Sequence, residues 1–389
     1  MNKNINHKFN SSKKVYRNKY TGDYYIDVQR HCPNCKREVK LRIYACRDCS
    51  AEYHISHNGE LIIGQGRYLS CRPHSKICKN YCKYCNGCRD RPPLRCECPR
   101  CRHKYLPSYD APEFCIQLVG GSNSGKTTFL AALWHIYLEK YGKGINAANG
   151  FRLEPAEYFE MLERSYQQGI SEATSQRNAI SSCVIHLDNA KRDIQQFSIY
   201  DIAGEVFSDR NYDVQQEQFA YCDGFVVIID PIAVAQVRDE NDINDYTVFS
   251  QDDVNDVISG FCEKFSAIRG IKTNEQSNVP ISVVITKVDI KTVKRRLGRP
   301  KVQTVANNLY KGDLLVARDE MCREYLFEIG LNNAVNNIEA MFTNIHYFPV
   351  SAIGHSAEFG KPYDPWGVFE AIEWIIKEKS EGLTKILEL

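Results

Sequence analysis

The residues of this chain with the clearest chemistry form one short loop, Gly120-Gly121-Ser122-Asn123-Ser124-Gly125-Lys126-Thr127, which reads G-x-x-x-x-G-K-T. Glycines let a backbone wrap around an anion, and successive N–H groups can then point at it. The Lys126 side chain would reach the β- and γ-phosphates of a nucleotide, and the Thr127 hydroxyl would bind Mg²⁺. The predicted phosphate-binding residues are Gly120, Ser122, Asn123, Ser124, Gly125, Lys126, Thr127 and Thr128.

Two regular elements must flank such a loop. Residues 114–119 form a short apolar run that predicts a strand, and residues 128–141 carry apolar side chains at helical spacing. A strand, a glycine-rich loop and a helix in this order distinguish a phosphate-binding loop from a chance match to the pattern. The helix N-terminus adds positive potential at the loop.

A second motif follows the predicted strand 194–200, which we expect to pair with residues 183–187. The strand ends in Asp201-Ile202-Ala203-Gly204-Glu205, which reads D-x-x-G before the glutamate. An aspartate at a strand end can hold Mg²⁺, and the N–H of the glycine can sense a γ-phosphate. Without the loop at 120–127, an ordinary turn would explain the same residues.

Two further motifs come at the ends of strands predicted at 280–285 and 345–350. The first strand delivers Thr286-Lys287-Val288-Asp289, and the second delivers Ser351-Ala352. A fixed Asp289 carboxylate can accept both the N1–H and the N2–H of guanine, and adenine offers no such pair. Residues 224–229 predict another buried strand. The remaining expected elements are helices at 156–168 and 366–379, and an acidic solvated loop at 239–256 that enters a helix ending near Gly270. We also expect the basic residues between 291 and 301 to form a solvated loop near the guanine edge.

The order G-x4-G-K-T, D-x-x-G, T-K-x-D and S-A resembles the P-loop GTPases of the translation-factor-related class, which includes Ras-like and dynamin-like proteins. The resemblance covers about residues 113–380 and extends, at the level of the fold, to GTPases of bacterial conflict systems. It implies an α/β domain with a mostly parallel sheet, helices on both faces and nucleotide at the carboxyl ends of the strands.

The same resemblance implies GTP and GDP as ligands and GTP hydrolysis as the activity. By matching positions, Mg²⁺ would lie on Thr127 and Asp201. The implied guanine-site residues are Thr286, Lys287, Asp289, Ser351 and Ala352. The implied catalytic residues are Lys126, Asp201, Gly204, Glu205 and Asn123.

The chain departs from the class at three places. Thr286 replaces the usual asparagine, and Glu205 replaces the glutamine that positions water in Ras-like members. The first-switch threonine is not identified, with Thr174, Ser181 and Ser182 as candidates. Because the Glu205 carboxylate would lie near an anionic γ-phosphate, we expect slow hydrolysis without a partner or a monovalent cation. Asn123 occupies the position at which cation-dependent members help to hold K⁺; the alternative is an Asx-type hydrogen bond within the loop.

Twelve of the 17 cysteines lie before residue 102, among polar residues. Reduced cysteines at C-x2-C spacing are typical zinc ligands, and four thiolates bind one tetrahedral Zn²⁺. The first predicted site is Cys32, Cys35, Cys46 and Cys49. A second would join Cys85 and Cys88 to Cys98 and Cys101. A third would use Cys71, Cys78, Cys82 and Cys96, with His74 as an alternative ligand.

The spacing Cys78-x3-Cys82-x2-Cys85 also matches that of radical-SAM iron–sulfur enzymes. We reject this interpretation, because that chemistry requires a large β/α barrel of its own. All-cysteine zinc sites have no open coordination position, so the predicted zinc ions are structural.

The net charge changes sign near residue 110, which is close to where the run of cysteines ends. Residues 1–110 hold 23 Lys/Arg and 9 Asp/Glu, a net charge of +14, whereas the remainder carries −12. We therefore predict a flexible basic tail (1–30), a zinc ribbon (31–57), a second cysteine-rich module (58–106) and the GTPase domain (111–389). The basic module suits either nucleic acid or a protein effector.

The N-terminal segment lacks an apolar signal region, and no apolar run is long enough to span a bilayer, so we expect a cytoplasmic protein. The sequence leaves the oligomeric state open. It favours a GTPase switch whose zinc modules recruit a partner. Two alternatives stay open: an ATP-dependent or kinase-type P-loop enzyme, and a nucleic-acid-binding zinc protein regulated by nucleotide.

Overall fold

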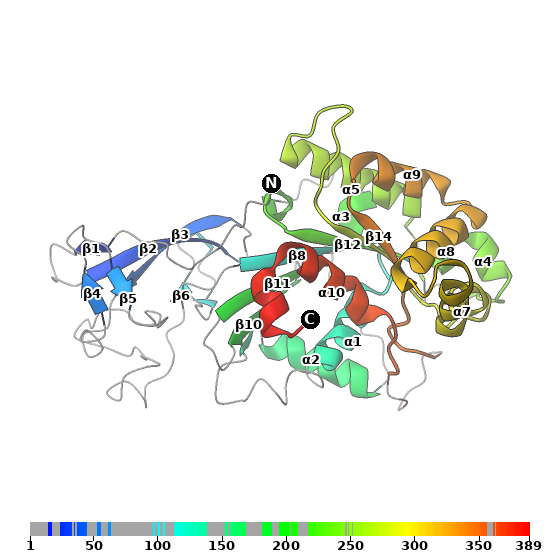
Figure 1. The fold of residues 1–389 in the computed structure, drawn as a ribbon, viewed down its shortest axis with the longest axis horizontal. Coiled ribbons are helices and arrows are strands. Elements are labelled where there is room, and N and C mark those ends of the chain that lie inside the picture. The colour runs from blue at the N-terminus through cyan, green and yellow to red at the C-terminus, as the bar shows by residue number, and fades with distance from the viewer. Residues whose placement is uncertain are drawn as a thin grey trace. The chain divides into compact units, whose positions relative to one another are not determined.

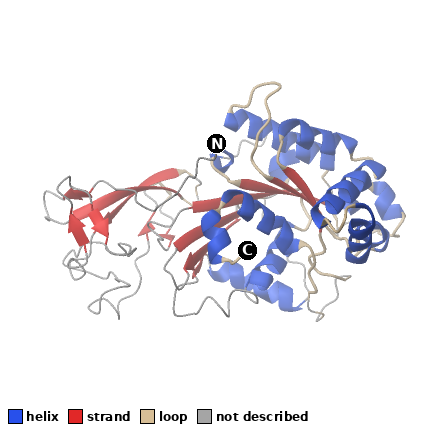
Figure 2. Cartoon of the chain, viewed as in Figure 1, coloured by secondary structure: helices blue, strands red, loops and turns tan. Residues whose placement is uncertain are grey.

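The chain divides into two compact units, Met1–Pro112 and Glu113–Leu389. In the described residues the first unit contains strands, and all the helices belong to the second (Figures 1 and 2). The computed structural model describes residues 15–17, 24–32, 35, 37–44, 53–55, 61–63, 96–97, 100–101, 104–105, 113–137, 152–154, 156–168, 181–188, 194–202, 204–208, 217–245, 247, 249–250, 252–355, 361 and 363–389.

The N-terminal unit is built from small antiparallel sheets. Three strands pair in the order β1-β2-β3, β4 pairs with β5, and β6 pairs with β7. Residues 15–17 and 24–30, which the sequence predicted within a flexible tail, form strands because β3 supplies a partner for β2. The strands are β1 Val15–Arg17, β2 Tyr24–His31, β3 Glu38–Tyr44, β4 Tyr53–Ile55, β5 Leu61–Ile63, β6 Cys96–Glu97 and β7 Lys104–Tyr105.

The C-terminal unit is organised around a seven-stranded sheet in the order β14-β13-β12-β8-β11-β10-β9. The first five strands run parallel, and β10 and β9 are antiparallel at one edge. This confirms the predicted mostly parallel α/β domain; β9 is an addition that the sequence did not indicate. The strands are β8 Glu113–Val119, β9 Arg152–Glu154, β10 Ser181–Asp188, β11 Ile194–Asp201, β12 Gly224–Ile229, β13 Ile281–Ile285 and β14 Ile345–Pro349.

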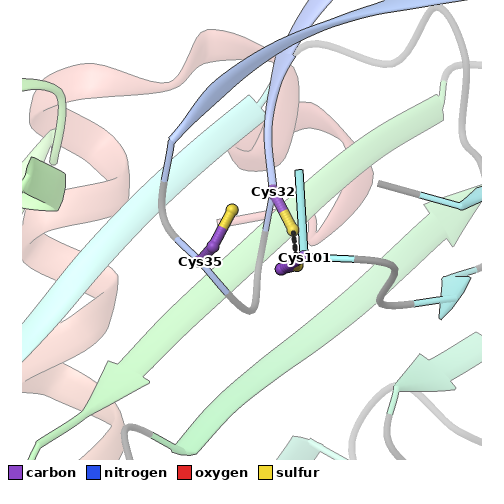
Figure 3. Close-up of side chains that lie close together, drawn as sticks. All are labelled: Cys32, Cys35 and Cys101. Carbon is purple, nitrogen blue, oxygen red and sulfur yellow. Dashed lines mark hydrogen bonds between the residues drawn. The ribbon is translucent and has the colours of Figure 1, made fainter. Parts of the chain in front are cut away.

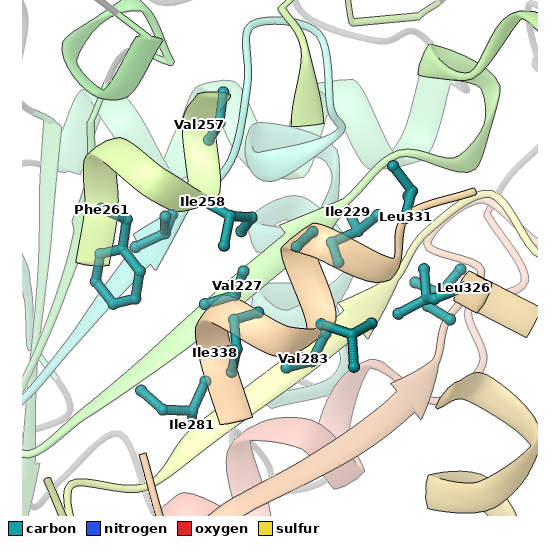
Figure 4. Close-up of a cluster of buried hydrophobic side chains, with 14 of the residues drawn as sticks. Val227, Ile229, Val257, Ile258, Phe261, Ile281, Val283, Leu326, Leu331 and Ile338 are labelled. Carbon is teal, nitrogen blue, oxygen red and sulfur yellow. The ribbon is translucent and has the colours of Figure 1, made fainter. Parts of the chain in front are cut away.

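The central strands are mostly apolar, with Gln117 and Ser282 as buried polar exceptions, because helices cover both faces of the sheet. On β8, Phe114, Ile116 and Leu118 pack into one hydrophobic cluster, while Cys115 and Val119 pack into the other. Figure 4 shows the second cluster, where side chains of β12 and β13 meet those of the helices above them. The carboxyl ends of these strands are thus held at one edge of a rigid layer.

The helices divide between these two clusters. Helices α1 Lys126–Tyr137, α2 Ala156–Gln168, α10 Val368–Lys379 and α11 Glu381–Ile386 contribute to the first. Helices α3 Glu205–Ser208, α5 Val254–Arg269, α8 Leu314–Glu328 and α9 Asn332–Met341 contribute to the second. Helix α5 ends where the sequence predicted, next to Gly270, whose φ of 65° provides a left-handed cap.

The basic segment 291–301, expected as a loop, instead folds into helices. Val293 and Leu297, and then Val302 and Ala306, are buried at a spacing of four residues, so one face of each helix joins the core. The elements here are α6 Lys291–Leu297 and α7 Arg299–Leu309; shorter ones before them are η5 Glu217–Ala220, η6 Pro231–Ala233 and α4 Ala235–Asp239. None of the helices described is both long and apolar enough to cross a membrane.

Candidate nucleotide site and cysteine cluster

The predicted phosphate-binding loop connects β8 directly to α1. Its backbone is left-handed at Asn123, with a φ of 56°, and at Gly125, with a φ of 97°. Asparagine adopts this region more readily than most residues. The Lys126 side chain is only 6% exposed, and its Nζ donates to the carbonyl oxygens of Gly120 at 3.0 Å and Gly121 at 2.7 Å. The ammonium group is therefore already held inside the loop.

The two predicted Mg²⁺ ligands lie together at the ends of neighbouring elements. Thr127 Oγ1 donates to Asp201 Oδ2 at 3.3 Å, and Asp201 is 1% exposed. They meet because β11, which ends at Asp201, runs parallel to β8. A hydroxyl and a carboxylate are hard oxygen ligands of the kind that Mg²⁺ prefers, so this pair fits the predicted metal.

The glycine of D-x-x-G is packed against the phosphate loop. A Cβ atom on Gly204 would lie 2.1 Å from the Ser122 nitrogen and 2.3 Å from the Gly121 carbonyl carbon. No residue with a side chain fits there without moving the backbone. Gly204 thus brings the start of α3 against the third residue of the loop.

The first two residues of T-K-x-D also contact this loop. Thr286 Oγ1 lies 3.1 Å from the Ser124 carbonyl oxygen and 3.2 Å from that of Ile229, and its hydroxyl donates to them. Lys287 Nζ donates to the Asn123 carbonyl oxygen at 3.2 Å. The replacement of asparagine by Thr286 therefore keeps a hydrogen bond to the phosphate loop.

Asp289 is oriented by the next strand end. Ser351 Oγ donates to Asp289 Oδ1 at 2.5 Å and accepts from the Gly354 N–H at 2.9 Å. The parallel pairing of β13 with β14 places these residues side by side. Ser351 and Ala352 are buried, whereas Asp289 is half-buried. The carboxylate predicted to read guanine is thus fixed at one oxygen.

Sequence reasoning missed two carboxylates of the site. Asp230, 1% exposed at the end of β12, accepts from Lys287 Nζ at 2.6 Å and from the Ser250 N–H at 3.0 Å. Asp252 Oδ2 accepts from the Ser122 N–H at 2.5 Å. The Asp-Pro pair that ends a buried strand was a usable signal for Asp230, whereas nothing local separates Asp252 from the acidic residues around it.

For the remaining predicted site residues, the structure describes the backbone or nothing. Glu205 begins α3, and its side chain lies outside the described residues. Ser181 and Ser182 begin β10, where Ser181 is opposite Asp201 in the register with β11. Thr174 also lies outside the described residues, so the first switch stays a prediction.

Three predicted zinc ligands meet in the N-terminal unit. The sulfurs of Cys32, Cys35 and Cys101 all lie within 4.8 Å of one another, with Cys32 Sγ and Cys101 Sγ 3.7 Å apart (Figure 3). A tetrahedral zinc ion with Zn–S bonds of about 2.3 Å sets its sulfurs about 3.8 Å apart. A disulfide would require about 2.05 Å. The spacing therefore fits thiolates arranged around a metal ion.

This cluster differs from the predicted grouping, in which Cys101 belonged to a second site. With Cys101 present, a four-coordinate ion has one position left and cannot take both Cys46 and Cys49. Local spacing favoured the nearer pair, but the fold brings a distant segment to Cys32. The other predicted ligands lie outside the described residues: Cys46, Cys49, Cys71, Cys78, Cys82, Cys85, Cys88, Cys98 and the alternative ligand His74. Cys96 begins β6, but its side chain is also outside the described part.

The mostly parallel sheet, with the glycine-rich loop between β8 and α1, has the P-loop fold that the sequence predicted. Residues 117–285 match the family model Double-GTPase 1, a stretch that is less than half of the chain. No curated protein matches the chain.

Several solved structures are similar to the chain at low identity. The Arl6 small GTPase of Trypanosoma brucei is 11% identical, with a TM-score of 0.31, and the match covers 68% of this chain and 96% of that one. A nucleolar GTP-binding protein 1 of Plasmodium falciparum is 14% identical, with a TM-score of 0.30, over 73% and 96%. The Ski7 GTPase-like domain of S. cerevisiae is 14% identical, with a TM-score of 0.31, over 62% and 43%.

Proposed function

We propose that the chain is a switch that binds and hydrolyses GTP, with an N-terminal cysteine-rich unit that recruits its partner. The main support for this proposal is that the residues of T-K-x-D make two separate sets of contacts. Thr286 and Lys287 hold the phosphate loop, and Asp289 is oriented by Ser351 at the neighbouring strand end. A carboxylate fixed in this way can accept two N–H groups from guanine and none that adenine offers in the same place.

The loop residues supply the phosphate chemistry. Lys126 would transfer its ammonium hydrogen bonds from the Gly120 and Gly121 carbonyls to phosphate oxygens. Thr127 and Asp201 would hold Mg²⁺, which when bound neutralises charge on the β- and γ-phosphates. Gly204, packed on Ser122, would bring the D-x-x-G backbone to the γ-phosphate, so that this segment differs between the GTP and GDP states.

The test is a nucleotide competition on the purified full chain. A fluorescent GDP analogue should be displaced by GTP and GDP at concentrations at least a hundredfold below those needed for ATP, and GTP should be hydrolysed. Asp289→Asn should shift the preference towards xanthosine triphosphate, because the amide can donate to the extra carbonyl. Lys126→Ala is the control that should weaken binding of every nucleotide. Displacement by ATP as effective as by GTP would instead identify an ATP-dependent enzyme.

Hydrolysis is proposed to depend on a monovalent cation at Asn123 or on a partner. In the part of the chain that the structure describes, the Asn123 side chain makes no hydrogen bond. The backbone carbonyl oxygen of Asn123 accepts one, from Lys287 Nζ. The Asn123 side chain therefore does not form the Asx-type hydrogen bond within the loop that was the alternative to cation binding. Turnover should be faster in K⁺ than in Na⁺ at equal ionic strength, and Asn123→Ala should abolish the difference. Equal rates in both salts would leave the partner mechanism.

For the N-terminal unit we propose that Cys32, Cys35 and Cys101 hold one structural zinc ion. The fourth ligand would be Cys98, which forms a C-x2-C pair with Cys101. Eight predicted ligands then remain, enough for two more four-cysteine sites. The net charge of +14 on residues 1–110 suits a partner with an acidic surface or a phosphate backbone.

Metal analysis tests this assignment. The full chain should carry two or three zinc ions, and Cys101→Ser should lose one of them. Arg100→Ser, at the adjacent exposed position, should leave the zinc content unchanged. Fewer than two zinc ions in the unmodified chain, or iron with visible absorbance, would overturn the zinc proposal.

A further inference from the structure

The segment between β12 and α5 carries a carboxylate onto the phosphate loop. Asp252 Oδ2 accepts from the Ser122 N–H at 2.5 Å. The two side chains also pack closely on the loop backbone, because a Cβ on Gly121 would lie 2.4 Å from Ser250 Oγ and 3.1 Å from the Asp252 side chain. An acidic residue thus occupies a donor of the loop that is built to bind anions.

This carboxylate is positioned by a chain of hydrogen bonds that begins at the guanine motif. The Asp252 N–H donates to Ser250 Oγ at 3.3 Å, and the Ser250 N–H donates to the buried Asp230, which also accepts from Lys287. The following helix does not use Asp252 as its cap. Asp253 fills that role by accepting from the Asn255 N–H at 2.7 Å. Asp252 is therefore directed at the loop and is not needed to start α5.

The N–H that Asp252 occupies lies beside Gly204, the residue that the proposed function assigns to the γ-phosphate. Gly204 packs against the same Ser122 nitrogen, and the glycine of D-x-x-G is the backbone that responds to a γ-phosphate. GDP leaves this position without an added charge, whereas GTP brings an anionic phosphate towards the Asp252 carboxylate. Like charges at such a partly buried site repel.

We propose that Asp252 is a specificity-determining residue that lowers the affinity for GTP relative to GDP. The proposal rests on the proposed function of the same site. The carboxylate favours the GDP-bound chain, and GTP binds fully only when the side chains of Ser250 and Asp252 move off the loop. A switch built in this way rests in the GDP state.

The experiment compares Asp252→Asn with Asp253→Asn in the full chain. Both remove one negative charge from adjacent positions, and asparagine is as good a helix cap as aspartate, so α5 should be unaffected. The amide oxygen introduced by Asp252→Asn can still accept from the Ser122 N–H. Affinities for GDP and for a non-hydrolysable GTP analogue are measured by calorimetry. We expect the ratio of GTP to GDP affinity to rise about tenfold in Asp252→Asn and to stay unchanged in Asp253→Asn.

A second variant, Asp252→Ser, must shift the ratio in the same direction, with all proteins showing the thermal unfolding midpoint of the parent chain. Equal shifts for GDP and GTP, a loss of GTP affinity, or the same change in Asp253→Asn would overturn the role of Asp252. If the parent chain binds no guanine nucleotide, the proposed function fails, and the role of Asp252 fails with it.

Discussion

Thr286 shows how a single substitution in a guanine motif can keep one role and lose another. Its hydroxyl donates to the carbonyl oxygens of Ser124 and Ile229, so it joins the phosphate loop to the ends of β12 and β13. The longer amide of asparagine could make such a contact and also approach the base. In the proposed function, base selection is left to Asp289, so that loop anchoring and base reading should be separable by mutation.

Thr286→Val should therefore weaken GTP and GDP binding equally, by several-fold. The valine keeps the shape of threonine but removes a hydrogen bond of about 1 kcal/mol. The preference for GTP over ATP should not change. Thr304→Val, which removes an exposed hydroxyl bonded within α7, is the matched control. A change in base preference without loss of affinity would show that Thr286 contacts the base.

Asp223 is a half-buried carboxyl directly before β12, where it accepts from the Cys115 N–H at 2.8 Å. Burial raises its pKa to about 6, against the opposing effects of the Cys115 hydrogen bond and the charge of Arg269. A folded-state pKa above the unfolded value of 3.8 means that the folded chain holds the proton more tightly. Its stabilising contribution is complete below pH 4 and is lost as the pH rises to about 6.

Asp223→Asn should consequently stabilise the chain at neutral pH by about 1–3 kcal/mol and have little effect near pH 4. The amide oxygen can still accept from Cys115, so only the ionisation is removed. Urea unfolding between pH 4 and pH 7.5 measures the difference between variant and parent. The exposed Asp242→Asn gives the baseline. A difference that is constant across this range would mean that Asp223 is not protonated in the fold.

At the scale of elements, the site depends on where parallel strands end. The carboxyl ends of β8, β11, β12, β13 and β14 deliver the phosphate loop, Asp201, Asp230, Thr286 and Ser351 to one edge of the sheet. Close backbone packing then joins these ends without intervening side chains. The contact of Gly204 with Ser122 is an example, since a Cβ there would lie 2.1 Å from a backbone nitrogen.

Gly204→Ala should separate the D-x-x-G segment from the loop. Because the obstruction is backbone, the segment itself must move, and we expect GTP turnover to fall at least tenfold. GDP affinity should change much less, since GDP lacks the phosphate that this glycine senses. Single-turnover hydrolysis and GDP binding, measured on the same preparation, give the comparison. Unchanged turnover would show that α3 reaches the γ-phosphate by another route.

The parts of the site that could be predicted from sequence are those set by local patterns. The phosphate loop, D-x-x-G and T-K-x-D each follow a strand whose apolar run is visible in the chain, and the α/β fold follows from their order. Asp252 could not be predicted, because its partner Ser122 is 130 residues away. The basic segment 291–301 was mistaken for a loop because its charges obscure two buried apolar positions, Val293 and Leu297.

At the scale of the whole molecule, the two compact units have different sources of stability. The C-terminal unit contains two hydrophobic clusters on either side of its sheet, whereas the described residues of the N-terminal unit form strands and the cysteine cluster. A small unit with little apolar core commonly depends on metal to fold. The loss of zinc should therefore affect one unit and not the other.

A chelator should unfold residues 31–105 while GTP binding largely survives. Residues 113–389 expressed alone should bind GTP within about threefold of the full chain, because both hydrophobic clusters and the nucleotide site lie within them. Hydrogen exchange with and without chelator measures the two units separately. Loss of GTP binding on chelation would show that the cysteine-rich unit supports the nucleotide site directly.

The meeting of Cys32 with Cys101 also has a consequence for synthesis of the chain. The two residues are 69 positions apart, and ribosomes add about 5–20 residues per second, so Cys32 and Cys35 wait roughly 3–14 s for Cys101 to emerge. During that interval Cys46 and Cys49 are the nearest thiols in the emerging chain. If Cys32, Cys35, Cys46 and Cys49 bound a zinc ion at this stage, the chain would be held in a kinetic trap. It would leave the trap only when Cys101 displaces one of these ligands from the zinc ion. The order in which cysteines leave the ribosome thus competes with the grouping that the folded chain requires.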